Sequence, residues 1–137
     1  MPLSESGTVP NARWMTWTGR ILSFVVVAQL LSSAWVRATH HASAVAEIVT
    51  GYGYPESAIT RIVITECTLV VLYLIPQTAV FGAVVMTGYL GGAIAAHLRT
   101  GNMARAVIPL VIAIFAWGGL YLRDGRIRQL LPFRRPA

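Results

Sequence analysis

Residues Thr78–Leu98 read TAVFGAVVMTGYLGGAIAAHL and contain no Asp, Glu, Lys or Arg. A helix needs about 20 mostly apolar residues to cross the hydrocarbon core of a bilayer, and this run has that length. Three further long runs are also mostly apolar. They are Ile21–Thr39, Ala58–Ile75 and Ala106–Leu122. Because backbone amides in lipid must be hydrogen-bonded within their own segment, each run is predicted to form a transmembrane helix.

The predicted fold is therefore all-α: an integral membrane four-helix bundle with a short interfacial helix between helices 1 and 2. We expect one transmembrane domain at 19–131, preceded by a polar N-terminal tail at 1–18 and followed by a basic C-terminal tail at 132–137. The spans are expected at about 20–39, 58–75, 78–98 and 106–122. The first run is interpreted as a retained helix and not as a cleaved signal peptide, because its long apolar stretch meets Arg37, His40 and His41 before any cleavage site.

The connection between the first two spans predicts the interfacial helix. Its apolar side chains recur at helical spacing. They are Val45, Ile48, Val49 and Tyr52. Gly51, Gly53 and Pro55 then break the helix. Two interpretations stay open: the apolar face only packs or contacts lipid, or the segment is a lid over a ligand cavity.

Composition and charge limit the class of protein. Hydrophobic residues make up 55% of the 137 residues and charged residues 12%, against about 25% charged in a soluble domain. All eleven basic residues are Arg, and they flank the apolar runs, so we expect lipid and not nucleic acid as a partner. Seven Arg lie beside the termini and four beside the opposite helix ends. The positive-inside rule then predicts a multi-pass protein of the bacterial inner membrane with both termini cytoplasmic.

Glu66 is the most informative single residue, because a carboxyl group in the middle of a membrane span must face the bundle interior or a wet cavity. A helical hairpin brings Thr87 and Tyr89 to the same depth, and Gln29 lies near the middle of the first span. These four residues form a predicted buried polar cluster. Its acid is interpreted either as interhelical hydrogen-bond glue or as a proton-carrying or ligand-binding group.

The charge of Glu66 follows from its expected neighbours. Arg61 lies five positions before it, which is about 140° round the helix, so Arg61 should not reach the carboxyl group. With no cation close by, burial disfavours the charged form. The sequence therefore predicts a largely protonated Glu66 at neutral pH.

A group of basic side chains is expected at the opposite ends of the helices from the termini. This predicted outer basic rim contains Arg37, His40, Arg61, His97 and Arg99. The residues are interpreted as snorkelling and capping groups, or as a rim that receives an anionic head group, a sulfur oxyanion or a quinone carbonyl. No metal site is expected, because His40 and His41 are adjacent and lack the spacing of helical ligands.

Small residues occupy Gly88 and Gly92 of the third run at four-residue spacing. Such spacing lets helix backbones approach closely in lipid. We expect these two glycines to pack against another helix of the same chain, with a dimer face as the alternative. A homo-oligomer is therefore left open as an assembly state.

Several short motifs together resemble the DoxX-like family of small bacterial membrane proteins. The motifs are Gly53-Tyr54-Pro55, Glu66-Cys67, the run from Leu72 to Thr78, Gly88 to Ala93, His97 with Arg99, and Trp117 to Asp124. The resemblance spans about Gly19 to Leu131 and implies four transmembrane helices. It points to Glu66, His97, Arg99 and Asp124 without giving them a catalytic role. The family takes its name from a relative associated with thiosulfate–quinone oxidation, and some relatives are linked to membrane oxidoreductase assemblies.

Three functions are consistent with these observations. The resemblance favours an accessory subunit of a membrane oxidoreductase system near the quinone pool, with a quinone as ligand and redox subunits as partners. The sequence carries no haem, flavin or iron–sulfur motif, so no covalently bound cofactor is expected and electrons would come from a partner. The alternatives are a noncatalytic lipid-binding, small-molecule-binding or assembly protein, and a subunit of an oligomeric transporter.

Overall fold

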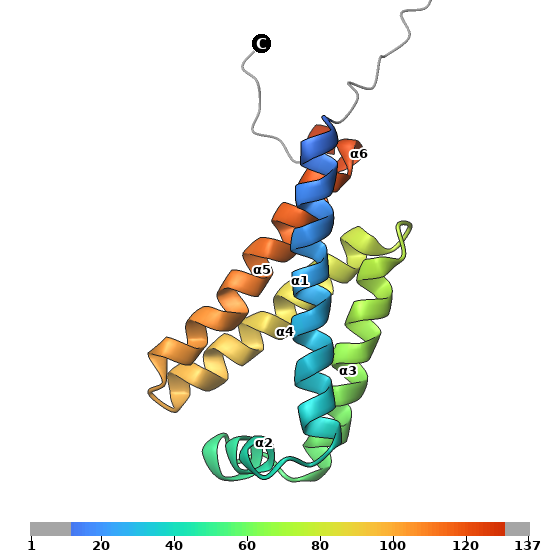
Figure 1. Cartoon of the computed structure of the whole chain (residues 1–137). Helices are drawn as coiled ribbons and strands as arrows, with labels where there is room; N and C mark the ends of the chain where they lie inside the picture. The colour runs from blue at the N-terminus through green and yellow to red at the C-terminus, as the bar shows by residue number, and fades with distance from the viewer. Residues whose placement is uncertain (1–11, 131–137) are drawn as a thin grey trace, which may run out of the picture.

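The computed structural model describes residues 12–130, and seven helical elements make up this part of the chain (Figure 1). They are α1 (Arg13–Ala38), α2 (Ala42–Ala46), η1 (Glu47–Gly51), α3 (Ser57–Leu74), α4 (Ala79–Arg99), α5 (Met103–Arg123) and α6 (Gly125–Leu130). Within the described residues, α1, α3, α4 and α5 are long and apolar enough to cross a membrane. The all-α, four-helix prediction is confirmed, and the chain is a multi-pass membrane protein.

The first helix begins earlier than the sequence predicts. Residues 13–18, which we assigned to the N-terminal tail, form the first turns of α1. Trp14 and Trp17 are 65% and 60% exposed there, and the Arg20 guanidinium lies 5.7 Å from the Trp17 ring centre. Aromatic and basic side chains of this kind sit at the membrane–water interface, so they extend the helix beyond the apolar run. Residues 1–11 and the expected C-terminal tail at 132–137 lie outside the described residues.

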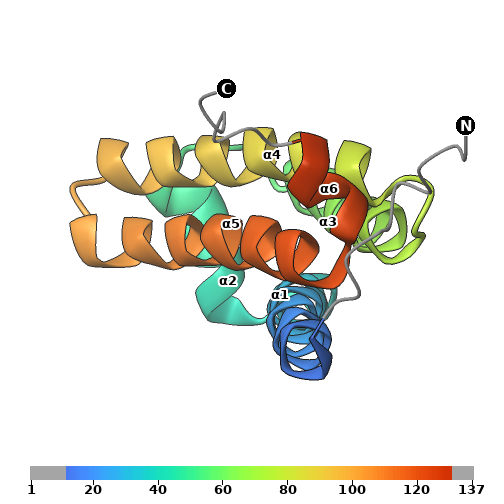
Figure 2. The same ribbon diagram turned by 90° about the horizontal axis from the view of Figure 1, so that it is seen from above.

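The four long helices form two pairs. α1 packs against α3 and α5, and α4 packs against the same two helices. Figures 1 and 2 show α4 and α5 side by side and inclined away from α1 and α3. The start of α1, the α3–α4 connection and α6 lie at one end, which we call the hairpin end. α2 and η1, together the strap (Ala42–Gly51), lie across the opposite end, the strap end.

Glycines bring the helix backbones together at the hairpin end. A Cβ on Gly19 would lie 2.8 Å from the Gly119 carbonyl oxygen, and a Cβ on Gly119 would lie 2.7 Å from Ser23 Oγ. A Cβ on Gly82 would lie 2.8 Å from the Tyr73 backbone nitrogen. These close approaches join α1 to α5 and α4 to α3.

The expectation that Gly88 and Gly92 pack against another helix of the chain is wrong. A Cβ added at either position would meet nothing within 4 Å. Both glycines lie on an exposed side of α4, whereas Gly82, two turns or less before Gly88, faces the interior. The rotation of α4 about its axis brings Gly82, and not Gly88 or Gly92, against another helix.

A buried polar contact also ties the hairpin end together. The Tyr73 hydroxyl donates a hydrogen bond to the Ala116 carbonyl at 2.8 Å, and Ser23 Oγ lies 3.1 Å from the same hydroxyl. These groups connect α3 with α5 and α1. Around them lies an apolar core that includes Val26, Leu69 and Met86, all at most 1% exposed. The hairpin end is therefore the tightly packed part of the molecule.

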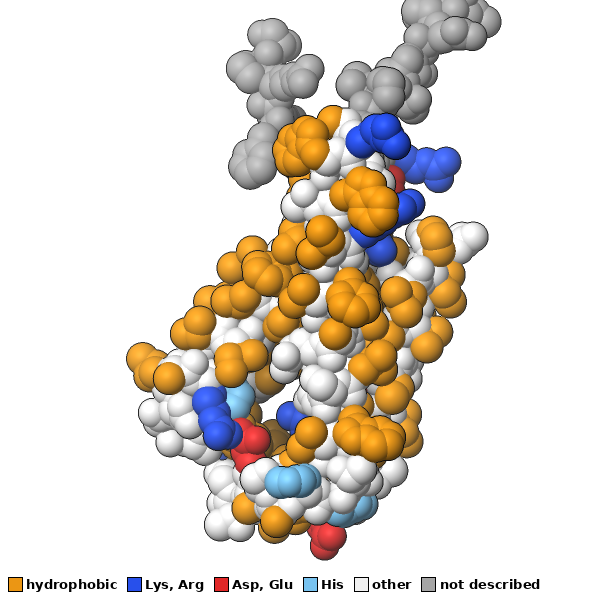
Figure 3. Space-filling model, viewed as in Figure 1, with side chains coloured by type: hydrophobic (Ala, Val, Ile, Leu, Met, Phe, Trp, Pro, Cys, Tyr) orange, Lys and Arg blue, Asp and Glu red, His pale blue; other side chains and the backbone are white. Residues whose placement is uncertain are grey.

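The surface carries many large apolar side chains that point away from this core (Figure 3). Phe24, Trp35 and Phe81 are each at least 61% exposed. A belt of exposed apolar groups around all four helices is what contact with lipid requires. At the strap end the two helix pairs diverge, and Figure 3 shows a hollow between α1 and α5 there.

Candidate functional site

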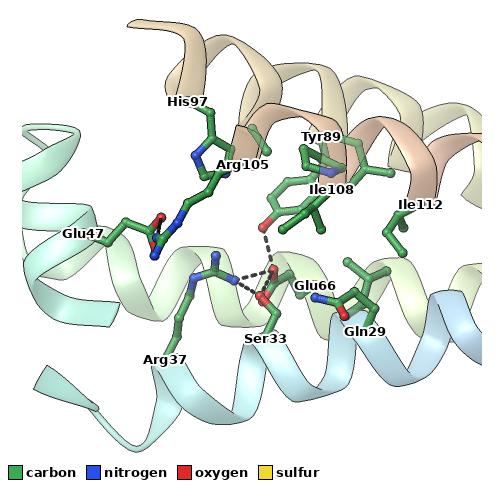
Figure 4. A pocket seen from close by; sticks show the side chains of 14 residues that line it. Gln29, Ser33, Arg37, Glu47, Glu66, Tyr89, His97, Arg105, Ile108 and Ile112 are labelled. Carbon is green, nitrogen blue, oxygen red and sulfur yellow. Dashed lines mark hydrogen bonds and ion pairs between the residues drawn. The ribbon is translucent and has the colours of Figure 1, made fainter. Parts of the chain in front are cut away.

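A cavity of about 360 Å³, the inner cavity, lies at the strap end between the diverging helices. Its volume falls within the range of about 300–1,000 Å³ that is typical of small-molecule sites. Polar and apolar side chains both line it (Figure 4). The polar ones are Gln29, Ser33, Arg37, Glu47, Glu66, Tyr89, His97 and Arg105, and the apolar ones include Ile108 and Ile112.

Three donors converge on one carboxylate oxygen at the base of this cavity. Oε1 of Glu66 accepts hydrogen bonds from Arg37 Nη1 at 2.6 Å, from the Tyr89 hydroxyl at 2.7 Å and from Ser33 Oγ at 3.0 Å. Arg37 also contacts Ser33. We call Ser33, Arg37, Glu66 and Tyr89 the acid cluster. It draws one side chain or more from each of α1, α3 and α4, so it holds these helices in register where their backbones diverge.

The ion pair overturns the premise behind a neutral Glu66. The sequence placed Arg61 out of reach, and Arg61 is exposed on α3. Arg37 of α1 supplies the cation instead, with its guanidinium 2.6 Å from a carboxyl group that is 2% exposed. A paired and hydrogen-bonded charge can persist in the interior, whereas an isolated one cannot. The premise that no cation lies close is therefore wrong.

A second set of polar groups connects the strap to α4 and α5. Oε1 of Glu47 accepts hydrogen bonds from the Tyr52 hydroxyl and from Arg105 Nη1, each at 2.8 Å. The Tyr52 oxygen lies 2.8 Å from His97 Nδ1. Since Tyr52 donates its proton to Glu47, its oxygen accepts from His97, which places a proton on Nδ1. We call Glu47, Tyr52, His97 and Arg105 the strap cluster.

The environment shifts the titration of two members of the strap cluster. Burial alone would raise the pKa of Glu47. The hydrogen bonds from Tyr52 and Arg105, with the charges of Arg105 and His97, outweigh burial and hold the pKa below its usual 4.5. Burial, followed by the hydrogen bond to Glu47 and its negative charge, raises the pKa of Tyr52. At neutral pH, Glu47 is an acceptor and Tyr52 keeps the proton that it donates.

The strap cluster separates the inner cavity from a second cavity of about 360 Å³, the outer cavity. Glu47, His97 and Arg105 line both of them. Ser43 and Gly51 of the strap line only the outer one. Ala44 and Ile48 of the strap are buried while other strap residues line the outer cavity, so the position of the strap fits both interpretations, packing and a lid.

The structure brings together part of the predicted buried polar cluster. Glu66 and Tyr89 are hydrogen-bonded, and Gln29 lines the same cavity. Thr87 lies elsewhere: its hydroxyl donates to the Ala83 carbonyl and accepts a hydrogen bond from Trp117 Nε1 at 2.9 Å. Depth along the helix matched Thr87 to Glu66, but its side chain points to α5.

Only part of the predicted outer basic rim lines the inner cavity. Arg37 and His97 point into the inner cavity, each held by a partner from another element. His40, Arg61 and Arg99 are exposed and do not line it. His40 has a φ of 48°, in the left-handed region, and ends the turn after α1.

Sequence reasoning missed four residues of the site: Ser33, Glu47, Tyr52 and Arg105. Glu47 carried a usable signal, because it is one of five acidic residues in the whole chain and lies in the predicted interfacial helix. Its partner Arg105 is 58 positions away, so no local pattern connects them. Ser33 precedes Arg37 by one helical turn and shares its face, which is a spacing that the sequence does display.

The combined site can bind a small molecule that has both an apolar body and hydrogen-bonding groups. The acid cluster offers a carboxylate, the strap cluster offers Arg105 and His97, and Ile108 and Ile112 supply apolar contact. Within residues 12–130, no group of three or more His, Cys, Asp or Glu side chains is placed to hold a metal ion.

Comparison with known protein families gives a match. The sequence profile of the DoxX-like family matches residues 21–119, which is more than half of the chain and includes every residue of the acid and strap clusters. No curated protein and no solved structure is significantly similar to the chain.

Proposed function

The chain belongs to the DoxX-like family, and from that premise we propose that it binds a quinone head group in the inner cavity, as an accessory subunit of a membrane oxidoreductase system. In this proposal it resides in the bacterial inner membrane with both termini in the cytoplasm. Partner subunits exchange electrons with the bound quinone, because a quinone-binding subunit needs a separate redox centre to act on the quinone.

One observation carries the proposal: the inner cavity has a buried carboxylate at its base and an apolar side chain in its wall that is also exposed on the surface of the bundle. The hollow between α1 and α5 in Figure 3 lies above the strap, and charged and apolar side chains both border it. Ile108, which lines the inner cavity, is 52% exposed, while Glu66 at the base is 2% exposed. A molecule with a polar ring and an apolar tail can place the ring on the acid cluster while its tail stays in lipid.

The first test is binding to the cavity itself. Ala93 lines the inner cavity on α4, and Ala95 lies on an exposed side of the same helix. Ala93→Phe fills the cavity without removing a polar group, and Ala95→Phe adds the same side chain where it meets lipid. We expect the protein and Ala95→Phe, purified in nanodiscs, to bind decylubiquinone, and Ala93→Phe to lose at least tenfold in affinity. Equal binding by both variants contradicts the proposal.

The second test concerns partners. Native membranes are solubilised with a polymer that keeps the surrounding lipid, and the tagged protein is isolated with whatever it binds. Flavin-, haem- or iron–sulfur-containing subunits together with extractable quinone support the accessory role. Recovery of the protein with lipid alone contradicts that role.

The alternative is a noncatalytic lipid-binding or assembly protein, and the presence of Arg37 and Arg105 in the cavity wall favours it. Guanidinium groups bind phosphate through paired hydrogen bonds. Both groups, however, already pair with a carboxylate, Arg37 with Glu66 and Arg105 with Glu47. An anionic phosphate bound to either guanidinium would lie close to the paired carboxylate and be repelled by its charge, so an uncharged quinone head group fits the cavity better.

A further inference from the structure

We propose that the inner cavity prefers the reduced, quinol form of its ligand, with a ligand hydroxyl donating a hydrogen bond to Oε2 of Glu66. This inference rests on the proposed function and deepens it by naming the redox form that is bound. It follows from a difference between the two carboxylate oxygens of Glu66. Oε1 accepts three hydrogen bonds, and Oε2 accepts none within the described residues.

The two oxygens of Glu66 are used unequally. Oε1 accepts from Arg37, Tyr89 and Ser33, whereas Oε2 is buried and accepts no hydrogen bond from any group in the described residues. Buried polar atoms without a partner are rare in native proteins, and each one calls for an explanation. Glu66 lines the inner cavity, so a group bound there is a suitable partner for its free oxygen.

The missing partner must be a donor. Arg37 pairs with the Glu66 carboxylate as its counter-ion, and a carboxylate only accepts hydrogen bonds. The terminal torsion of a Glu side chain is broad, and both oxygens turn together about it. Binding therefore requires a small rotation that brings Oε2 toward the cavity and that the donors around Oε1 follow.

The two redox forms of a quinone differ in whether they can donate a hydrogen bond. A quinol presents hydroxyl groups, which donate, whereas a quinone presents carbonyl oxygens, which only accept. A quinone carbonyl facing Oε2 leaves two acceptors opposed and the carboxylate oxygen unsatisfied. A site that hydrogen-bonds a hydroxyl rejects an analogue without it, because its own buried group is then left without a partner.

Glu66→Gln replaces the hydrogen-bond acceptor Oε2 with an amide nitrogen, which is a donor. The three donors around Oε1 fix the orientation of the new amide, because only its oxygen can accept from Arg37, Tyr89 and Ser33. The amide nitrogen then takes the place of Oε2 and donates. The variant is expected to favour the quinone carbonyl over the quinol hydroxyl.

The experiment compares both redox forms in one preparation. The full chain is placed in phosphatidylcholine nanodiscs, whose lipid has no hydroxyl donor, and is titrated anaerobically with decylubiquinone and with decylubiquinol. Bound ligand is quantified by mass spectrometry. We expect the unmodified protein to bind the quinol about tenfold more tightly, and Glu66→Gln to bind the quinone more tightly. Glu56→Gln makes the same change at an exposed glutamate that does not line the inner cavity, so it should keep the quinol preference.

A second probe pair keeps the inference testable without redox chemistry or a folded Glu66→Gln variant. The unmodified protein should bind 4-decylphenol about tenfold more tightly than its methyl ether, which lacks only the donor. Equal binding of phenol and ether, or a preference for the quinone, overturns the inference while leaving quinone binding in place. Failure to bind either redox form overturns the proposed function itself.

Discussion

Arg37 and Glu66 form an ion pair that joins α1 to α3, with Nη1 and Oε1 2.6 Å apart and 29 positions between the residues. The arginine is 23% exposed and the glutamate is 2% exposed. The two partners are therefore unequal: the guanidinium can reach water, and the carboxylate depends on its protein donors.

Removing Arg37 alone should destabilise the protein more than removing both charges. Arg37→Gln leaves the buried Glu66 carboxylate without its counter-ion, which we expect to cost about 3–5 kcal/mol of unfolding free energy. The double variant, Arg37→Gln with Glu66→Gln, should recover most of that loss. Steric trapping in bicelles measures the unfolding free energy of each variant. A double variant no more stable than Arg37→Gln would show that the charge of Glu66 is not the cause.

Infrared spectroscopy should find Glu66 charged at neutral pH, because Arg37 and two further donors stabilise the carboxylate. The difference spectrum between the protein and Glu66→Gln is expected to contain a lost carboxylate band and no lost protonated-carbonyl band. Glu56, which is exposed, provides a matched control through Glu56→Gln. A lost protonated-carbonyl band specific to Glu66→Gln would restore the neutral acid that the sequence alone predicts.

The glycine contacts give a prediction about packing. Gly119→Ala introduces a Cβ 2.7 Å from Ser23 Oγ and 3.0 Å from the Gly19 carbonyl oxygen, so α1 and α5 must move apart. We expect a loss of about 1–3 kcal/mol in unfolding free energy. Gly88→Ala on α4 meets nothing within 4 Å and should cost nothing. The unfolding free energies of the two variants are measured by steric trapping. Equal losses for Gly119→Ala and Gly88→Ala would contradict the α1–α5 contact.

The ion pair between Glu47 and Arg105 should hold the strap only above a certain pH. The folded protein lowers the pKa of Glu47 from 4.5, so this contribution is fully present above pH 4.5 and disappears as the pH falls through the lowered value. Spin labels at Thr50→Cys and Leu98→Cys, in a Cys67→Ser background, report the strap position. We expect a narrow distance distribution at neutral pH and a distribution that broadens at an acidic pH below the lowered pKa of Glu47.

Glu47→Gln is the matched variant for the strap experiment. It removes the titrating group while keeping the size of the side chain, and the spin-label distances should be broad at both pH values. A distribution that narrows or stays constant on acidification would show that Glu47 does not hold the strap.

Topology is tested independently of the site. A reporter fused after residue 137 should be cytoplasmic, and a reporter inserted within Ala42–Thr50 should be periplasmic, as the Arg asymmetry predicts. Both insertion points lie outside the four spans. A periplasmic C-terminal reporter would reverse the assigned orientation of the strap end.

The sequence predicted the helices well because hydropathy is a local property. The expected spans differ from α3, α4 and α5 by at most three residues at either end. The start of α1 was missed, since Arg13 and Trp17 belong to the interface and not to an apolar run. The strap was found because its apolar residues repeat with helical spacing within one short segment.

The site was harder to predict, because it depends on how helices are rotated about their axes. Depth placed Glu66 and Tyr89 together, and it placed Thr87 with them equally well, although Thr87 turns to α5. Arg37 was expected at a solvated rim, yet its long side chain reaches back to the carboxylate. Glu47 and Arg105 meet only because the strap crosses to α5, which is a tertiary arrangement.

The close crossing of Gly19 and Gly119 holds α1 and α5 together at the hairpin end, and the opposite ends of these two helices enclose the cavity. Such a crossing acts as a fulcrum, so a small tilt of α5 on α1 becomes a larger displacement at the strap end. The width of the entrance would then be set far from the ligand, at positions that never touch it. Substitutions at the fulcrum should therefore change how fast a ligand enters and leaves before they change how tightly it is held.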